Sequence, residues 1–153
     1  MMSEEIDWDG LTFSLTPTDT MYLTETSSTE PWMPGTLRPY GPIEMSPASG
    51  VLNYGQGLFE GMKAFRTSKN RVVFFRPEEN ARRMQRGADR LKIPPVPESI
   101  FIDAVEQCVQ ANLRWVPPTG KGAMYVRPLL MGSGPILGVA PAPSYTFLVY
   151  VTP

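Results

Sequence analysis

Six segments have the apolar and polar pattern of β-strands. Met21–Thr26 (MYLTET) alternates clearly, whereas Leu37–Met45 is interrupted by two prolines, which favour an edge strand or an irregular stretch. The other four segments are Lys63–Thr67, Arg71–Arg76, Ala123–Met131 and Tyr145–Val151. Ser68–Asn70 joins the first two of these four as a hairpin. Within that hairpin, the continuous apolar run Val72–Phe75 predicts a strand that is buried on both faces.

Apolar residues at helical spacing predict two consecutive helices after this hairpin. The first begins at Pro77, where the missing N–H of proline costs little, and is ended by Pro94 and Pro95. Its expected buried stripe is Ala81, Met84, Ala88 and Leu91. The second helix runs from Glu98 to Trp115, and its stripe is Phe101, Ala104, Val105, Cys108, Val109 and Leu113. Cys108 on this stripe is expected to be a core residue.

Hairpins and consecutive helices, without regular alternation of strands and helices, indicate an α+β domain. The expected architecture is a mainly antiparallel sheet with the two consecutive helices packed on it. We assign residues 20–153 to this domain. Residues 1–19 form an acidic N-terminal arm that is expected to be partly disordered.

Composition restricts the possible functions. The 153 residues carry a net charge of −1, so there is no electrostatic footprint for nucleic acid or an acidic membrane. Histidine is absent and cysteine occurs once, which excludes Ser-His-Asp and Cys-His catalysis and gives no metal site. No apolar stretch is long enough to span a bilayer, and no signal or transit peptide is visible. We expect a cytoplasmic protein, or a plastid or mitochondrial one if a leader has been trimmed.

The stretch NYGQGLFEGMKAFR contains three glycines and a lysine within fourteen residues. Gly55, Gly57 and Gly61 are spaced as G-x-G-x-x-x-G, one residue longer than the dinucleotide-binding fingerprint, and a hairpin follows instead of a helix. The residues themselves therefore favour a tight bend over a phosphate loop. Lys63 could form a Schiff base if its pKa were lowered, but most lysines are solvated charges.

Candidates for binding an anion lie in two places, on the first helix and on the strand that contains Arg127. Arg82, Arg86 and Arg90 share one face of the first helix and fit a solvated surface. Arg83 lies elsewhere around that helix and could face a buried anion. Tyr125 and Arg127 point to the same face of a strand. That pair could hold a carboxylate or could be an ordinary surface pair.

Three long segments resemble the branched-chain amino acid aminotransferases, which are fold-type IV enzymes that use pyridoxal 5'-phosphate (PLP). The segments are LNYGQGLFEGMKAFR, FFRPEENARRMQRGADRL and MYVRPLLMGSGPILGVAPAP. The similarity extends from about Phe13 to Pro153 and is greatest to the plant branch. It implies the smaller N-terminal domain of that fold, with a larger C-terminal domain expected after Pro153.

The resemblance also implies roles for individual residues. Arg83 is expected to contact the PLP phosphate. The expected substrate-binding residues are Phe13, Tyr54, Phe59, Tyr125, Arg127, Leu137 and Val139. Of these, Arg127 belongs near the substrate carboxylate, and Tyr54, Leu137 and Val139 reach the pocket of the neighbouring subunit of a homodimer. The Schiff-base lysine of the family lies in the C-terminal domain, so no catalytic residue is expected in this chain.

The function implied by the resemblance is transfer of the amino group of leucine, isoleucine or valine to 2-oxoglutarate, with PLP as cofactor. The isolated chain is expected to be inactive because it lacks the Schiff-base lysine. The alternative is a naturally truncated, non-catalytic protein that binds partner subunits through the retained dimer interface. A relative acting on D-amino acids or aminodeoxychorismate is disfavoured by FEGMKAFR and YVRPLLMGSG.

Overall fold

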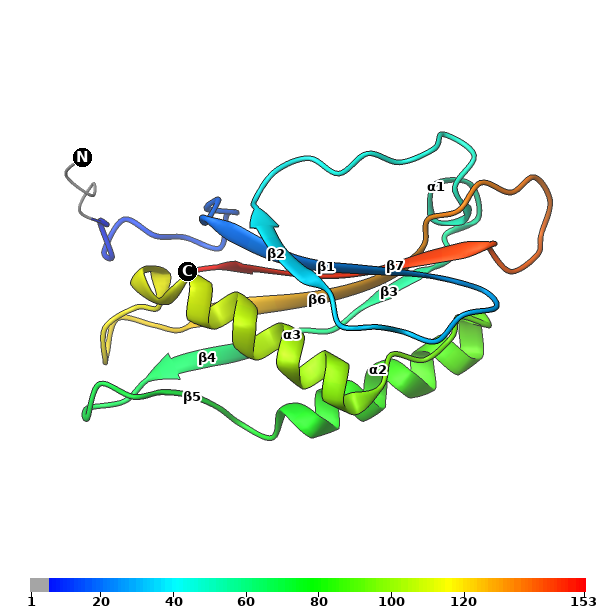
Figure 1. Ribbon diagram of the computed structural model, residues 1–153. Helices are drawn as coiled ribbons and strands as arrows, with labels where there is room; N and C mark the ends of the chain where they lie inside the picture. The colour runs from blue at the N-terminus through cyan, green and yellow to red at the C-terminus, as the bar shows by residue number, and fades with distance from the viewer. Residues whose placement is uncertain (1–5) are drawn as a thin grey trace.

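One antiparallel sheet forms the centre of the computed structural model, which describes residues 6–153 (Figure 1). Its seven strands are β1 (Thr20–Ser27), β2 (Thr36–Pro39), β3 (Gly57–Phe59), β4 (Met62–Arg66), β5 (Val72–Phe74), β6 (Met124–Gly132) and β7 (Ser144–Thr152). The strand order is β2-β1-β7-β6-β4-β5, and β3 pairs with the end of β6 that β4 leaves free. The predicted α+β class with a mainly antiparallel sheet is confirmed.

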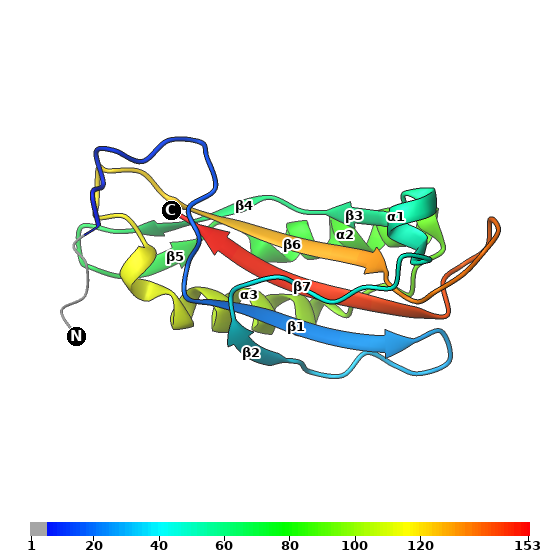
Figure 2. The same ribbon diagram turned by 90° about the horizontal axis from the view of Figure 1, so that it is seen from above.

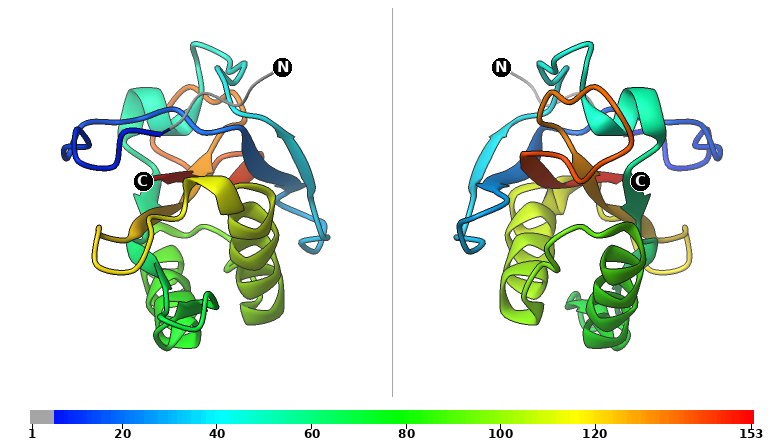
Figure 3. Two further views of the ribbon diagram at one scale, coloured as in Figure 1. Left: turned by 90° about the vertical axis from the view of Figure 1, so that its left-hand side faces the viewer. Right: turned by 90° about the vertical axis from the view of Figure 1, so that its right-hand side faces the viewer.

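Two helices, α2 (Pro77–Leu91) and α3 (Glu98–Ala111), cover one face of the sheet (Figure 3). The first turn of α2 carries Glu78 and Glu79, whose charges suit the positive end of the helix dipole. The last turn of α3 is followed by a short 3-10 helix, Leu113–Trp115. The opposite face of the sheet carries the N-terminal arm, the loop after β2 and a short helix, α1 (Gly50–Tyr54) (Figures 2 and 3).

Strand alternation divides the apolar residues between the two faces. On β6, Met124, Val126 and Leu130 belong to the main core beneath the helices. Leu129 and Met131 belong to a smaller cluster on the opposite face. Cys108 is fully buried in the main core, as predicted. The sheet therefore has a well-covered helix face and a face that is only partly covered.

Several predictions about the elements were wrong. The run Val72–Phe75 is not buried on both faces, because β5 is an edge strand that pairs only with β4. Its three residues are half-buried and Phe75 is 78% exposed. Leu91, the last residue of α2, is also exposed, whereas Ala81, Met84 and Ala88 of the predicted stripe are buried.

The bounds of several other elements differ from those predicted from the sequence. The second expected strand shortens to the exposed four residues of β2, because the chain leaves the sheet after Pro39. Helix α3 ends at Ala111 instead of Trp115. No pattern in the sequence indicated α1, which ends with Gly55 in the left-handed conformation (φ 65°).

The N-terminal arm has no helix or strand from residue 6 to Asp19. Residues 1–5 lie outside the described part of the chain. The expected partial disorder of the arm therefore stays a prediction, as does the division at residue 20.

Candidate functional site

A two-residue link between β3 and β4 lies beside several of the predicted site residues. It consists of Glu60 and Gly61 and continues along β6, with which both strands pair, and the Glu60 N–H donates to the carbonyl of Pro128 at 2.9 Å. Phe59 is exposed on the open face of the sheet, whereas Glu60 is buried, with 4% of its surface exposed. Phe59 and the neighbouring Glu60 thus lie on opposite sides of the sheet.

Arg83 from α2 forms a two-pronged contact with Glu60. Its Nε donates to Oε1 and its Nη2 donates to Oε2 of Glu60, both at 2.7 Å. These hydrogen bonds, together with the charge of the carboxylate, raise the pKa of the Arg83 guanidinium. The buried anion that Arg83 faces is therefore a carboxylate of the chain itself. The Arg83 side chain remains 64% exposed, so one edge of it faces solvent.

Tyr125 and Arg127 lie side by side on the open face of β6, as their spacing predicted. Nε and Nη2 of Arg127 donate to the Tyr125 hydroxyl at 3.2 and 3.0 Å. The guanidinium also lies over the ring of Phe59, 4.1 Å from its centroid. Because the side chains of Tyr125 and Arg127 are half-buried, this is an organised cationic and aromatic cluster and not a loose surface pair.

A cleft of about 610 Å³ opens between this cluster and the N-terminal arm. Tyr125 and Arg127 line one side, and Leu11 to Leu15 of the arm line another. Phe13 contributes to the lining although its side chain is exposed. Lys63 is also at the cleft and is exposed to solvent. Apolar and cationic groups together suit a ligand with an apolar body and a carboxylate.

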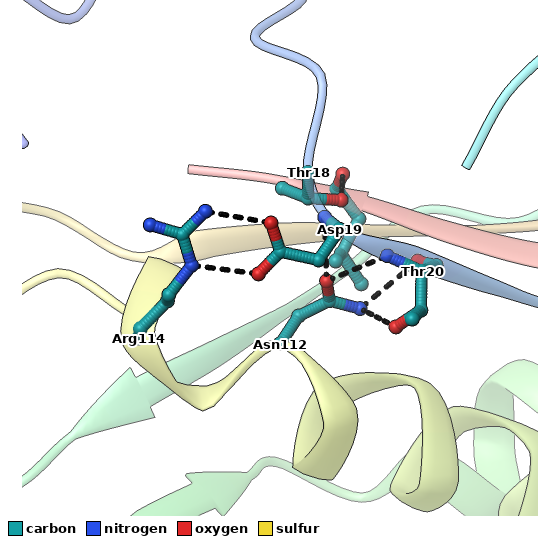
Figure 4. A network of polar contacts seen from close by, with 6 residues as sticks. Thr18, Asp19, Thr20, Asn112 and Arg114 are labelled. Atoms are coloured by element: carbon teal, nitrogen blue, oxygen red, sulfur yellow. Dashed lines mark hydrogen bonds and ion pairs between the residues drawn. The ribbon is translucent and has the colours of Figure 1, made fainter. Parts of the chain in front are cut away.

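The arm is held in place by a polar network at the end of α3 (Figure 4). The side-chain oxygen of the fully buried Asn112 accepts hydrogen bonds from the backbone N–H groups of Asp19 and Thr20, at 3.0 and 3.1 Å. Its side-chain nitrogen donates to the carbonyls of Thr20 and Cys108. Arg114 contacts both carboxylate oxygens of Asp19 at 2.6 Å, and these hydrogen bonds lower the pKa of Asp19.

Tyr54, Leu137 and Val139 form a separate group, at the end of the sheet where α1 meets the loop between β6 and β7 (Figure 2). The Gly138 N–H donates to the Tyr54 hydroxyl at 2.7 Å. Leu137 is 86% exposed and Val139 is 92% exposed. None of the three lines the cleft beside Tyr125. The structure therefore divides the expected substrate residues into two groups.

Sequence reasoning missed two residues that organise the site. Glu60 was overlooked inside FEGMK, although an acidic residue between an aromatic residue and a glycine in an apolar hairpin is unusual. Asn112 was overlooked at the end of a helical pattern, where asparagine commonly binds backbone groups.

Two further features concern only the described part of the chain. No helix within residues 6–153 is long and apolar enough to cross a membrane. The same residues contain no cluster of three or more histidine, cysteine, aspartate or glutamate side chains arranged to hold a metal ion.

Comparison with known proteins gives consistent results, although no family model matches the chain. Over 149 residues the chain is 56% identical to branched-chain amino acid aminotransferase 2, chloroplastic, of Humulus lupulus, and the match covers 97% of this chain and 36% of that protein. It is 43% identical over 148 residues to methionine aminotransferase BCAT4 of Arabidopsis thaliana, covering 97% of this chain and 42% of that protein. The chain thus spans well under half the length of these relatives.

Solved structures show the same fold at low sequence identity. One structure of the branched-chain amino acid aminotransferase of Escherichia coli aligns with 89% of this chain and 41% of its own, at a TM-score of 0.69 and 20% identity. A branched-chain aminotransferase solved with pyridoxamine 5'-phosphate aligns with 87% of this chain and 39% of its own, at a TM-score of 0.66 and 22% identity.

Proposed function

We propose that this chain, which corresponds to the smaller N-terminal domain of the fold-type IV branched-chain aminotransferases, supplies the substrate wall and part of the phosphate grip of a PLP-dependent transaminase. The observation that carries this proposal is that the link between β3 and β4 joins two arrangements on opposite sides of the sheet. These are the cluster of Phe59, Tyr125 and Arg127 on the open face and the pair of Glu60 and Arg83 on the helix side. Transfer of an amino group from leucine, isoleucine or valine to 2-oxoglutarate is the proposed reaction of the whole protein.

The chemistry of Arg83 fits a phosphate group. Glu60 occupies only the edge formed by Nε and Nη2, and guanidinium has five N–H donors. The outer edge consists of Nη1 and the second hydrogen of Nη2, which take no part in this contact, and it has the fork geometry that binds phosphate. When bound, PLP would supply the electron sink for the amino-group transfer.

The cleft residues have distinct proposed roles. Arg127 would hold the substrate carboxylate, with its orientation fixed by the Tyr125 hydroxyl and the ring of Phe59. The arm around Phe13, which lines the cleft, would contact the substrate side chain, and Phe59 would do so from beside the cleft, where its ring lies against Arg127. Apolar pockets discriminate by only about 1–3 kcal/mol per methylene. The methionine aminotransferase among the relatives fits this weak selectivity.

No residue of this chain is assigned the Schiff base, and Lys63 is the lysine to test because it is exposed at the cleft. The test is PLP titration of the purified chain, followed by borohydride reduction and mass mapping of the modified lysines. We expect no lysine to be trapped stoichiometrically. Stoichiometric trapping of Lys63 would overturn the assignment, since the chain would then carry cofactor chemistry of its own.

A second candidate function is binding of partner subunits without catalysis. The observation that favours it is the exposure of Leu137 and Val139, two large apolar side chains on one loop. In the whole protein the same loop would contribute to a homodimer. The expected cytoplasmic location stays a prediction, and several relatives are named chloroplastic or mitochondrial.

A further inference from the structure

Glu60 is a buried carboxylate that the proposed reaction does not use. It is 4% exposed, and within residues 6–153 its carboxylate forms an ion pair with Arg83. Burying a carboxylate is costly unless it is paired and hydrogen-bonded. The free-energy cost of burying the Glu60 carboxylate beside Arg83 therefore requires a physical explanation.

Contacts from two elements fix the Glu60 carboxylate. Its own N–H is bound to the Pro128 carbonyl on β6, which fixes the backbone of the link between β3 and β4. Asn80 of α2 donates from Nδ2 to Oε2 of Glu60 at 2.9 Å and reaches the Gly61 carbonyl at 3.3 Å. The carboxylate is therefore held by both the sheet and the helix before Arg83 is considered.

The Arg83 side chain, in contrast to that of Glu60, is mostly exposed to solvent. It is 64% exposed and has the large rotamer freedom of a long, solvated chain. The two 2.7 Å bonds to Glu60 use Nε and Nη2, which fixes the plane of the guanidinium as well as its position. In that plane Nη1 and the second hydrogen of Nη2 remain outside the contact with Glu60.

We infer that Glu60 is a positioning residue for phosphate recognition. It holds the inner edge of the Arg83 guanidinium so that the outer edge is presented, preorganised, to a phosphate monoester. This inference rests on the proposed role of Arg83 in PLP binding. Without Glu60, binding of the phosphate would have to order a flexible arginine, which lowers affinity.

Simple electrostatics predicts the opposite effect, and this makes the inference testable. Glu60 is a negative charge near the proposed phosphate position, so its removal should tighten phosphate binding if charge alone matters. If orientation dominates, its removal should weaken phosphate binding. The sign of the change therefore distinguishes a positioning carboxylate from a competing one.

The experiment is a titration of the purified 153-residue chain with inorganic phosphate, followed through the Arg83 Nε–H signal in ¹⁵N NMR spectra. In the unsubstituted chain we expect a slowly exchanging Nε–H signal that shifts on phosphate addition. Glu60→Gln should abolish its protection and weaken phosphate binding about tenfold, by analogy with the loss of metal affinity when the hydrogen-bonded partner of a metal ligand is removed. Unchanged or tighter binding by Glu60→Gln would overturn the inference.

Two further variants separate this inference from the proposed function. Glu79→Gln removes a carboxylate from the same helix that pairs with Arg76 and Arg82, so it controls for charge and should leave phosphate binding unchanged. Arg83→Ala should abolish the binding. If Arg83→Ala binds phosphate normally, the proposed role of Arg83 is wrong. If only Arg83→Ala loses binding, the role of Glu60 alone is wrong.

Glu60→Gln could impair folding because its carboxylate is buried. Asn80→Ala then serves as the second variant, since it removes one donor to Glu60 and leaves both bonds to Arg83 in place. It should weaken phosphate binding by less than the tenfold change and broaden the Nε–H signal. A sharp signal with normal phosphate affinity in Asn80→Ala would also count against the inference.

Discussion

At the scale of single residues, Gly61 allows the link between β3 and β4 to approach Tyr125. A Cβ atom at this position would clash severely with the Tyr125 hydroxyl. The same hydroxyl accepts two hydrogen bonds from Arg127. The absence of a side chain at Gly61 is therefore a condition for the cluster on the open face.

We predict that Gly61→Ala displaces Tyr125 and destabilises the domain by about 1–3 kcal/mol, the usual cost of overpacking. The measurement is the free energy of unfolding from urea denaturation. Gly41→Ala is the matched control, because nothing lies within 4 Å of a Cβ atom at that position. Equal free energies of unfolding for the two variants would show that the backbone at Gly61 and the Tyr125 side chain can move apart without loss of stability.

Cys108 gives a second residue-scale prediction, which concerns pH. Burial raises the pKa of its thiol from 9.0 to about 12. At pH 8 the folded chain should therefore be alkylated by iodoacetamide about a thousandfold more slowly than the urea-unfolded chain, because the thiolate is the reactive form. Comparable rates in the two states, measured by mass spectrometry, would contradict the buried position.

The same pKa difference has a definite sign for stability. The unfolded chain loses the thiol proton near pH 9, whereas the folded chain retains it until about pH 12. The thiol therefore costs no stability below pH 9, and stability falls progressively between pH 9 and 12. Cys108→Ala should lack this component of the alkaline loss, which comparison of the two urea denaturation series against pH would reveal.

At the scale of elements, Asn112 connects segments that are distant in sequence. It follows the end of α3, binds the backbone where the arm becomes β1, and lies beside Arg114, which contacts Asp19 (Figure 4). The hydroxyl of Thr18 donates to the carbonyl of Val151 on β7 and extends the anchor. The position of the arm, and with it one wall of the cleft, depends on this end of α3.

We predict that Asn112→Ala destabilises the domain by about 2–3 kcal/mol, since each buried donor left without a partner costs about 1–3 kcal/mol. Hydrogen exchange should also become faster at Asp19 and Thr20. Gln110→Ala, at an exposed position on the same helix, is the control and should change stability by less than about 0.5 kcal/mol. Unchanged exchange at Asp19 in Asn112→Ala would refute the anchoring role.

At the scale of the whole molecule, the two faces of the sheet differ in how well they are covered. The helix face carries the main core, whereas the opposite face has a small cluster centred on Leu23, Met131 and Leu148. Leu137 and Val139 extend beyond this face on the loop between β6 and β7. Exposed apolar surface of this kind favours association with another protein surface.

We predict that the chain self-associates through this loop as its concentration rises. The double variant Leu137→Ser and Val139→Ser should reduce the association measured by sedimentation velocity, with little change in melting temperature because both side chains are exposed. The double variant Met33→Ser and Phe75→Ser is the control, since it removes comparable exposed apolar residues elsewhere. Equal effects of both double variants would indicate non-specific association.

The sequence by itself determined the elements whose signals are local. The start of α2 at Pro77, the buried stripe of α3 and the shared face of Tyr125 and Arg127 follow from periodicity and proline chemistry. The three quoted segments also indicated the family and the candidate residues. The local features depend only on neighbours in the chain, so the sequence is sufficient to predict them.

Only the tertiary structure decided which residues meet across the sheet. The run Val72–Phe75 had the pattern of a central strand, but its burial depends on whether a further strand lies beside it. Glu60 and Arg83 are 23 positions apart, and Asn112 and Asp19 are 93 positions apart. The partner of a buried polar group is set by how distant segments pack, and local patterns contain no information about that packing.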